Sequence, residues 1–226
     1  QRLLHAAQSQ GVSRFIYMST FHVYGPAAAQ PITENSPTRP IHPYAITHRL
    51  AEDFVNSHRH NQKMETLILR LSNGYGYPAD VGAGRWSLVF NDLCRQAVET
   101  KEIKLRSSGI QQRDFVSITD VSRGVRHFLN LPEGGWGEGL FNFGGECSMS
   151  IVEVARFVAA EYLRHFGKTS PITTGQDDPA QTSEPVVFSI EKLKSTGFCL
   201  NGEMAEEVRQ TFRMCEQLSL QGTGEK

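Results

Sequence analysis

The chain has 226 residues, 39% hydrophobic and 21% charged, which allows one large domain or two small ones and excludes a disordered chain. Lysine and arginine number 23 against 24 aspartate and glutamate, so a nucleic-acid partner is not expected, and an anionic ligand depends on a few placed arginines. No apolar run reaches the roughly 20 residues that span a bilayer, and four scattered cysteines predict free thiols in the cytoplasm, with neither a metal site nor a membrane partner.

The first part of the chain alternates predicted helices and strands. Residues 3–7 have helical spacing, and the apolar run at 14–19 predicts a buried parallel strand. Five prolines make residues 25–43 a long loop. A helix at 44–60 follows, and 65–71 predicts a second buried strand. We expect Phe15, Ile16 and residues 67–69 in the core.

The second part continues this alternation after an irregular stretch at 72–84. Further strands are expected at 103–105, 114–118 and 140–143. Helices are expected at 86–99, 120–129, 151–165, 190–194 and 203–218. Asp120 is interpreted as a helix N-cap, and Ser150 with Glu153 forms a capping-box pattern. Alternating strands and helices predict an α/β fold with a mainly parallel sheet.

Three polar motifs follow predicted strands or begin a helix. Ser19 and Thr20 end the first strand, and ligands of open α/β sheets bind beyond the carboxyl ends of strands. Tyr44 and His48 lie four residues apart, so they share one helix face. The stretch 70–76 is a strand end that leads into a glycine-containing loop.

Five motifs in the same order resemble the extended branch of the short-chain dehydrogenase/reductase superfamily, the NAD-dependent nucleotide-sugar epimerases and dehydratases. The family's S-S/T-x-x-V-Y-G corresponds to residues 19–25, its P-Y-x-x-x-K to 43–48, its R-x-x-N-x-Y-G to 70–76, its G-x-x-x-R-D-F/Y-V-x-V-x-D-V to 109–121, and its N-x-G to 142–144. A single match of this kind is weak evidence, but five in the right order are strong.

The resemblance implies a role for each matched residue. Tyr44 would be the acid/base, and Thr20 would bond the reacting oxygen. His48 would complete the catalytic set with Thr20 and Tyr44. Ser19, Tyr44 and His48 would contact NAD or NADP. The expected substrate contacts are Asn73, Arg113, Arg85 and His22, of which Arg113 suits a diphosphate.

The sequence departs from the family pattern at several places. His48 stands where the family has lysine, so Tyr44 loses a fixed positive charge beside it. The glycine-rich dinucleotide loop is absent and would lie upstream of Gln1, where the choice between NAD and NADP would also be made. Phe21 and His22 replace the acidic pair of the dehydratases, which disfavours 4,6-dehydration. The stretch 173–179 lacks a second phosphate-binding arginine.

The resemblance also implies a domain organisation. Residues 1–78 would be the C-terminal portion of a Rossmann-like, doubly wound dinucleotide-binding domain. Residues 79–218 would mainly form a smaller α/β substrate-binding domain, with 103–130 and 139–145 partly returning to the Rossmann core. Residues 219–226 would be a tail, of which 222–226 are expected to be disordered.

These observations leave three functional hypotheses. The first is an NAD(P)-dependent nucleotide-sugar epimerase, with an NADPH-dependent ketosugar reductase as its closest variant. The second is a catalytically impaired dinucleotide- or sugar-binding protein, because of His48. The third is a half-domain that binds no cofactor and exposes a sheet edge. The resemblance implies a homodimer that pairs through two helices per subunit, one of which would be the helix at 44–60. Its residues Ile46, Leu50 and Phe54 could serve either the dimer or the core.

Overall fold

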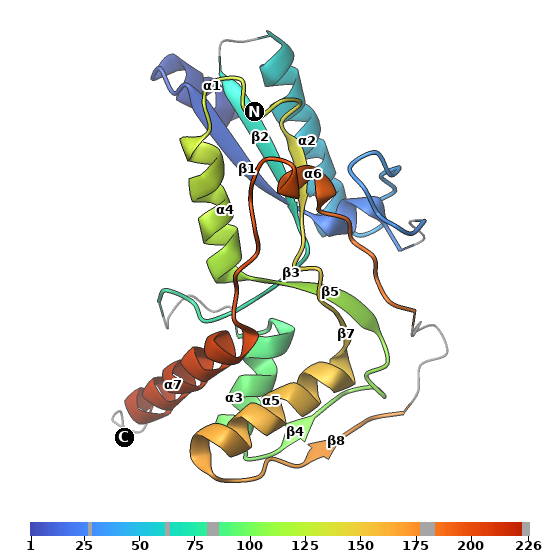
Figure 1. Ribbon diagram of the computed structural model, residues 1–226, viewed down its shortest axis with the longest axis vertical. Coiled ribbons are helices and arrows are strands. Elements are labelled where there is room, and N and C mark those ends of the chain that lie inside the picture. Colours follow the sequence, from blue (N-terminus) through green and yellow to red (C-terminus); the bar gives the residue numbers. More distant parts are fainter. Residues whose placement is uncertain (27–28, 62–63, 81–85, 177–183, 223–226) are drawn as a thin grey trace. The chain divides into compact units, whose positions relative to one another are not determined.

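The computed structural model describes residues 1–26, 29–61, 64–80, 86–176 and 184–222 (Figure 1). The chain divides into two compact units, which are described one at a time. Unit 1 comprises Gln1–Ser72, Val121–Glu146 and Val187–Leu200. Unit 2 comprises Asn73–Asp120, Cys147–Val186 and Asn201–Lys226.

The boundaries of these units differ from the predicted domain boundaries. The first segment of unit 1 ends at Ser72 rather than at residue 78. Residues 103–120 belong to unit 2, while 121–146 and 187–200 return to unit 1. The helix that was predicted to end at 218 continues to Gly222, so the first four residues of the predicted tail are helical. The last four lie outside the described residues.

Unit 1 is built on a parallel sheet in the order β1–β2–β6, which confirms the predicted α/β class. The strands are β1 (Arg14–Thr20), β2 (Glu65–Leu71) and β6 (Leu140–Phe143). Leu67, Ile68 and Leu69 of the central strand are buried as predicted, whereas Phe15 and Ile16 are only half-buried. In the described chain, β1 pairs only with β2, which explains its weaker burial.

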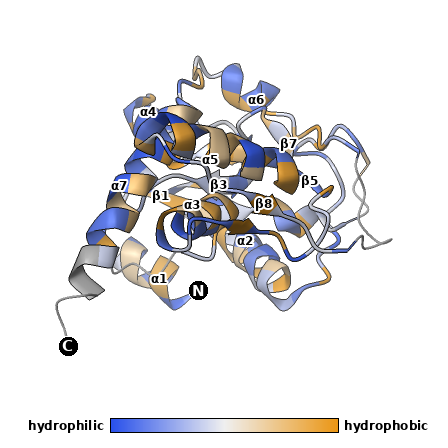
Figure 2. Ribbon diagram, turned by 90° about the horizontal axis from the view of Figure 1, so that it is seen from below, coloured by the Kyte–Doolittle hydropathy of each residue, from blue (hydrophilic) through white to orange (hydrophobic). Residues whose placement is uncertain are grey.

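Helices cover this sheet and a short turn follows β1. They are α1 (Arg2–Ser9), the 3-10 helix η1 (Phe21–Tyr24), α2 (Pro43–Asn61), α4 (Ile118–Asn130) and α6 (Glu191–Lys194). Helix α2 packs on β1 and β2 through residues that include Ala45 and Val55, both 2% exposed. Hydrophobic and hydrophilic residues alternate along α2 in Figure 2.

The described part of unit 2 has three helices around an apolar core, with short strands beside them. The helices are α3 (Val89–Glu99), α5 (Ile151–Phe166) and α7 (Met204–Gly222). The strands are β3 (Asn73–Tyr75), β4 (Ile103–Lys104), β5 (Gln112–Ser117), β7 (Ser148–Ser150) and β8 (Ile172–Thr173). Strand β5 lies between β3 and β7, parallel to the first and antiparallel to the second. Phe90, Phe115 and Phe212 are among the buried core residues.

Of the two helix caps predicted from the sequence, one is confirmed and the other is wrong. The capping box of α5 is confirmed, because the Ser150 hydroxyl accepts from the Glu153 backbone and the Glu153 carboxylate accepts in return. The N-cap interpretation of Asp120 is wrong. Helix α4 begins at Ile118, and the Ser117 hydroxyl accepts from the Asp120 backbone N–H. The Asp120 carboxylate instead accepts from two backbone N–H groups, at Asn201 and Gly202.

Across the described ranges, no helix is both long enough and apolar enough to cross a membrane. The same residues contain no cluster of three or more histidine, cysteine or acidic side chains suited to hold a metal ion.

Candidate active site

The carboxyl end of β1 places Ser19 and Thr20 together, with exposed fractions of 4% and 5%. The Thr20 hydroxyl oxygen accepts from the His22 backbone N–H at 3.3 Å and so caps η1. This bond uses the oxygen of Thr20 and leaves its O–H as a donor. The Ser19 hydroxyl, by contrast, donates its hydrogen bond to Glu52 Oε1 at 2.6 Å.

The first two turns of α2 carry Tyr44 and His48. Their ring centroids are 4.5 Å apart, as the spacing of four residues predicts. The His22 ring lies edge-on to Tyr44 at 6.2 Å. Tyr44 is 51% exposed, so its phenol is accessible to a ligand. Unit 1 therefore brings together His22, Tyr44 and His48 next to the strand end that carries Thr20.

His48 has a partner that the sequence did not indicate. Its Nδ1 and the Tyr17 hydroxyl on β1 share a hydrogen bond of 2.9 Å. Burial lowers the pKa of the His48 imidazole below its ordinary value of 6.5, although the Glu52 carboxylate acts in the opposite direction. The imidazole is therefore neutral at pH 7, unlike the lysine of the family pattern.

A buried ion pair between Glu52 of α2 and Arg70 of β2 lies next to this region. Glu52 is 1% exposed and accepts from Arg70 Nε at 3.0 Å and Nη2 at 2.7 Å. The Arg70 guanidinium lies over the Tyr24 ring, whose hydroxyl donates to Asn142 Oδ1 at 2.6 Å. The network links α2 to the ends of the strands and fixes Ser19. The family motif contains Arg70, but nothing in it indicates the Glu52 partner.

Asn73 and Arg113 belong to unit 2. The Asn73 amide donates to the Asp114 backbone carbonyl at 2.9 Å, which ties β3 to β5. This contact gives Asn73 a structural role. Arg113 donates to Gln111 Oε1 at 2.9 Å, and burial lowers the pKa of its guanidinium, which remains charged at neutral pH. Arg85 lies outside the described residues.

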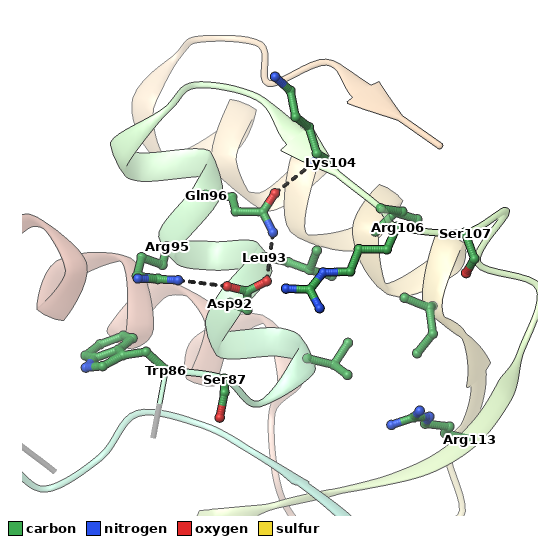
Figure 3. A pocket seen from close by; sticks show the side chains of 13 residues that line it. Trp86, Ser87, Asp92, Leu93, Arg95, Gln96, Lys104, Arg106, Ser107 and Arg113 are labelled. Atoms are coloured by element: carbon green, nitrogen blue, oxygen red, sulfur yellow. Dashed lines mark hydrogen bonds and ion pairs between the residues drawn. The ribbon is translucent and has the colours of Figure 1, made fainter. Parts of the chain in front are cut away.

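Arg113 lines a pocket of about 830 Å³ within unit 2. Arg106 reaches into the middle of this pocket and Arg113 enters from β5 (Figure 3). The other lining residues include Trp86, Asp92, Arg95, Gln96 and Lys104.

The basic residues of the pocket differ in their partners. Asp92 pairs with Arg95 at 3.0 Å, and Lys104 pairs with Glu102 at 3.0 Å. Within the described residues, neither Arg106 nor Arg113 has a carboxylate partner. These two guanidinium groups could therefore bind a phosphate or carboxylate of a ligand. The motif indicated Arg113, whereas Arg106 was missed because no motif includes it.

The site of unit 1 fits one part of a dinucleotide. His48 Nε2 has no partner among the described residues, and it lies beside the exposed Tyr44. A ribose hydroxyl could bond to that nitrogen. The glycine loop that brings a pyrophosphate onto a helix N-terminus is not part of this sequence. The described residues therefore offer His48 Nε2 as a group that could bond to a ribose hydroxyl.

Comparison with known proteins decides the family. The profile of the NAD dependent epimerase/dehydratase family matches residues 1–144, which is more than half of the chain. The chain belongs to this family. Its members depend on NAD, as the family's description states.

Individual relatives agree with this assignment. A dTDP-D-glucose 4,6-dehydratase of Mus musculus is 37% identical over 68% of this chain and 41% of its own length. An uncharacterised UDP-glucose epimerase of Bacillus subtilis, YtcB, is 29% identical over 70% of this chain and 48% of its own length. The chain thus spans less than half of these relatives.

Solved structures show the same fold. UDP-glucuronic acid 4-epimerase from Bacillus cereus, in complex with UDP-glucuronic acid and NAD, has a TM-score of 0.77 at 23% identity and covers 96% of this chain and 66% of its own. RMD from Pseudomonas aeruginosa, complexed with NADPH, has a TM-score of 0.80 at 22% identity over 96% of this chain and 71% of its own. These matches confirm the Rossmann-like α/β fold.

Proposed function

We propose that this protein is an NAD(P)-dependent epimerase of a nucleotide-activated sugar, with Tyr44 as the acid/base. The observation that carries the proposal is the exposed Tyr44 phenol, which lies against His48 and next to the end of β1. Family membership supports the reaction class, and relatives named as UDP-sugar epimerases support the substrate class.

Each residue of unit 1 has a defined task in this reaction. When bound, the nicotinamide would accept a hydride from a ring carbon and return it. Tyr44 would take the proton of the hydroxyl on that carbon and later give it back. Thr20 would donate its O–H to the same oxygen, since its own oxygen already accepts from His22. His48 would bond to the ribose through Nε2.

The neutral His48 imidazole limits the rate of proton transfer that Tyr44 can support. A phenol has an ordinary pKa near 10, so it needs a nearby positive charge to lose its proton at pH 7. His48 supplies none at that pH, because burial lowers its pKa. The positive charge of the oxidised nicotinamide would then have to assist proton transfer from Tyr44 without help from His48. We therefore expect slow turnover. A catalytically impaired dinucleotide- or sugar-binding protein is the second candidate function, because the neutral His48 imidazole also favours it.

Within unit 2, Arg106 and Arg113 would bind a diphosphate. Both guanidinium groups line one pocket, and neither has a carboxylate partner in the described part of the chain. The pocket of about 830 Å³ is within the size range of small-molecule sites.

Dehydration and ketone reduction are the related alternatives. The mouse relative is named as a 4,6-dehydratase, which favours dehydration. Phe21 and His22 oppose it, because they stand where the dehydratases of the family pattern carry Asp and Glu. Reduction of a ketosugar needs the same Tyr44 and Thr20 and differs in the direction of hydride transfer.

We also propose a homodimer formed through α2, in the reducing cytoplasm. Ile46, Leu50 and Phe54 are 47%, 55% and 37% exposed, so they do not serve the core of unit 1. An apolar stripe at this spacing is suited to pack against the same stripe of a second copy. The four cysteines are unpaired, as in a reducing compartment.

A product screen tests the proposal. The protein at its full natural length is incubated with NAD or NADP and with UDP- and dTDP-sugars, and the products are identified by NMR. We expect a stereoisomer of one nucleotide sugar. A 4-keto-6-deoxy product would instead establish dehydration. Tight dinucleotide binding without any product would favour the binding protein.

A further inference from the structure

Two side chains contact the His48 ring in unit 1. Tyr17 reaches it from β1 with its hydroxyl 2.9 Å from Nδ1, and the two ring centroids are 5.8 Å apart. Tyr44 contacts it from α2 with centroids 4.5 Å apart. The ring is thus tethered on one nitrogen, while Nε2 has no partner within the described residues.

We propose that Tyr17 is a positioning residue, which fixes His48 as the neutral imidazole with its proton on Nε2. The proposal deepens the proposed function, because Nε2 is the nitrogen offered to the dinucleotide ribose. A lysine at this position would be a charge on a flexible chain, whereas an imidazole must be held in one orientation and tautomer to donate one directed hydrogen bond.

The direction of the Tyr17–His48 bond follows from the two groups. Burial, followed by the charge of Glu52 and the proximity of Tyr44, raises the pKa of the Tyr17 phenol, so it keeps its proton. Burial lowers the pKa of His48, so the ring carries a single proton at pH 7. An unprotonated imidazole nitrogen is a stronger base than a phenol oxygen. Tyr17 therefore donates to Nδ1, and the ring proton stays on Nε2.

NMR of the protein labelled with ¹⁵N-histidine tests this directly, with His48→Gln used to assign the signals. In the unchanged protein at pH 7 we expect Nδ1 to be unprotonated and hydrogen-bonded. In Tyr17→Phe, the Nδ1 signal should move toward that of a free, unprotonated nitrogen. Tyr162→Phe, a buried tyrosine of unit 2, is the matched control and should leave the signal in place. A protonated Nδ1 in the unchanged protein, or no movement in Tyr17→Phe, would overturn the proposal.

Binding of NAD or NADP, measured by calorimetry, supplies a second readout. Tyr17→Phe should weaken binding about three- to tenfold, the effect of one neutral hydrogen bond. The same change in a His48→Lys background should have little effect, because the lysine has no Nδ1 to hold. An equal loss in both backgrounds would contradict a role that acts through His48. If the unchanged protein binds neither dinucleotide, the proposed function fails, while the NMR result still decides the role of Tyr17.

Discussion

His48 stands beside Tyr44 at the position where the family pattern has lysine. Two motifs that resemble the family pattern, at 19–25 and 43–48, identified Thr20, Tyr44 and His48 as candidates, and the structure places the rings of Tyr44 and His48 in contact. Tyr17 and Glu52 could not be identified in this way. The Tyr17–His48 contact joins residues 31 positions apart in the sequence, and the Glu52–Arg70 contact joins residues 18 positions apart. Such contacts between α2 and the strands depend on the tertiary fold.

His48→Lys should increase turnover, because it restores a positive charge one helical turn from Tyr44. We expect a gain of roughly tenfold at pH 7, at the low end of what acid–base assistance contributes. Initial rates with the accepted nucleotide sugar measure it. His165→Lys, on α5, controls for an added lysine and should have no effect. An unchanged or lower rate for His48→Lys would show that the lost charge does not limit this protein.

Arg106→Gln and Arg113→Gln should each raise KM for the nucleotide sugar with little change in kcat. A charge-assisted hydrogen bond contributes about 1.5–3 kcal/mol, so the expected rise is roughly ten- to hundredfold. Arg95→Gln is the matched control, because Arg95 lines the same pocket but is paired with Asp92. Equal effects of all three substitutions would argue against a specific anion site at Arg106 and Arg113.

At the scale of elements, the α-helices and five of the described strands were predictable, including the short β4 and β6, whereas three other short strands were not. The sequence predicted β2 and β6 with the observed bounds, as well as the capping box of α5. It missed β3, β7 and β8, which have two or three residues each and are set by pairing with distant strands. It misplaced the start of α4 because Ser117 and Asp120 are both good N-cap residues, and local preference does not choose between them.

Leu50→Asp should convert the proposed dimer to a monomer, because it places a charge in the centre of the apolar stripe on α2. Sedimentation velocity measures the change in mass. Val187→Asp changes another exposed apolar residue of unit 1, 52% exposed and outside α2, and should leave the dimer intact. A dimer that survives Leu50→Asp, or a monomeric unchanged protein, would rule out the α2 interface.

Glu207→Gln should stabilise the protein near pH 7. Glu207, on α7, is 5% exposed, and its Oε2 has no hydrogen-bond partner in the described chain. Burial raises the pKa of this carboxyl, so the folded state holds its proton more tightly than the unfolded state. Its contribution to stability is therefore full below its ordinary pKa of 4.5 and is lost as the pH rises through the folded value.

Urea unfolding at pH 5 and pH 7 measures this effect. Glutamine imitates the protonated carboxyl, so the free energy of unfolding should fall less between the two pH values in Glu207→Gln than in the unchanged protein. Glu203→Gln, an exposed position just before α7, is the control. The same pH dependence in Glu207→Gln and in the unchanged protein would contradict the assignment.

At the scale of the whole molecule, the chain passes twice from unit 1 to unit 2 and back before it ends in unit 2. The sequence predicted two units, and its boundaries differ from the observed division at 103–120, which lie in unit 2, and at 187–200, which lie in unit 1. Composition and periodicity describe each segment by itself, whereas the unit to which a segment returns is set by long-range packing. Residues 187–200, for example, return to unit 1, where Ser189 accepts from the Asn142 amide through its carbonyl and Ile190 is buried.

The central claim is that Tyr44 carries proton transfer in the conversion of a nucleotide sugar. The most direct test compares turnover by the unchanged protein, Tyr44→Phe and Tyr162→Phe at saturating NAD or NADP, with the product followed by NMR. The account predicts that Tyr44→Phe lowers kcat by at least about a hundredfold, in the range of general acid–base catalysis, while Tyr162→Phe retains the rate. An unchanged rate in Tyr44→Phe would contradict it.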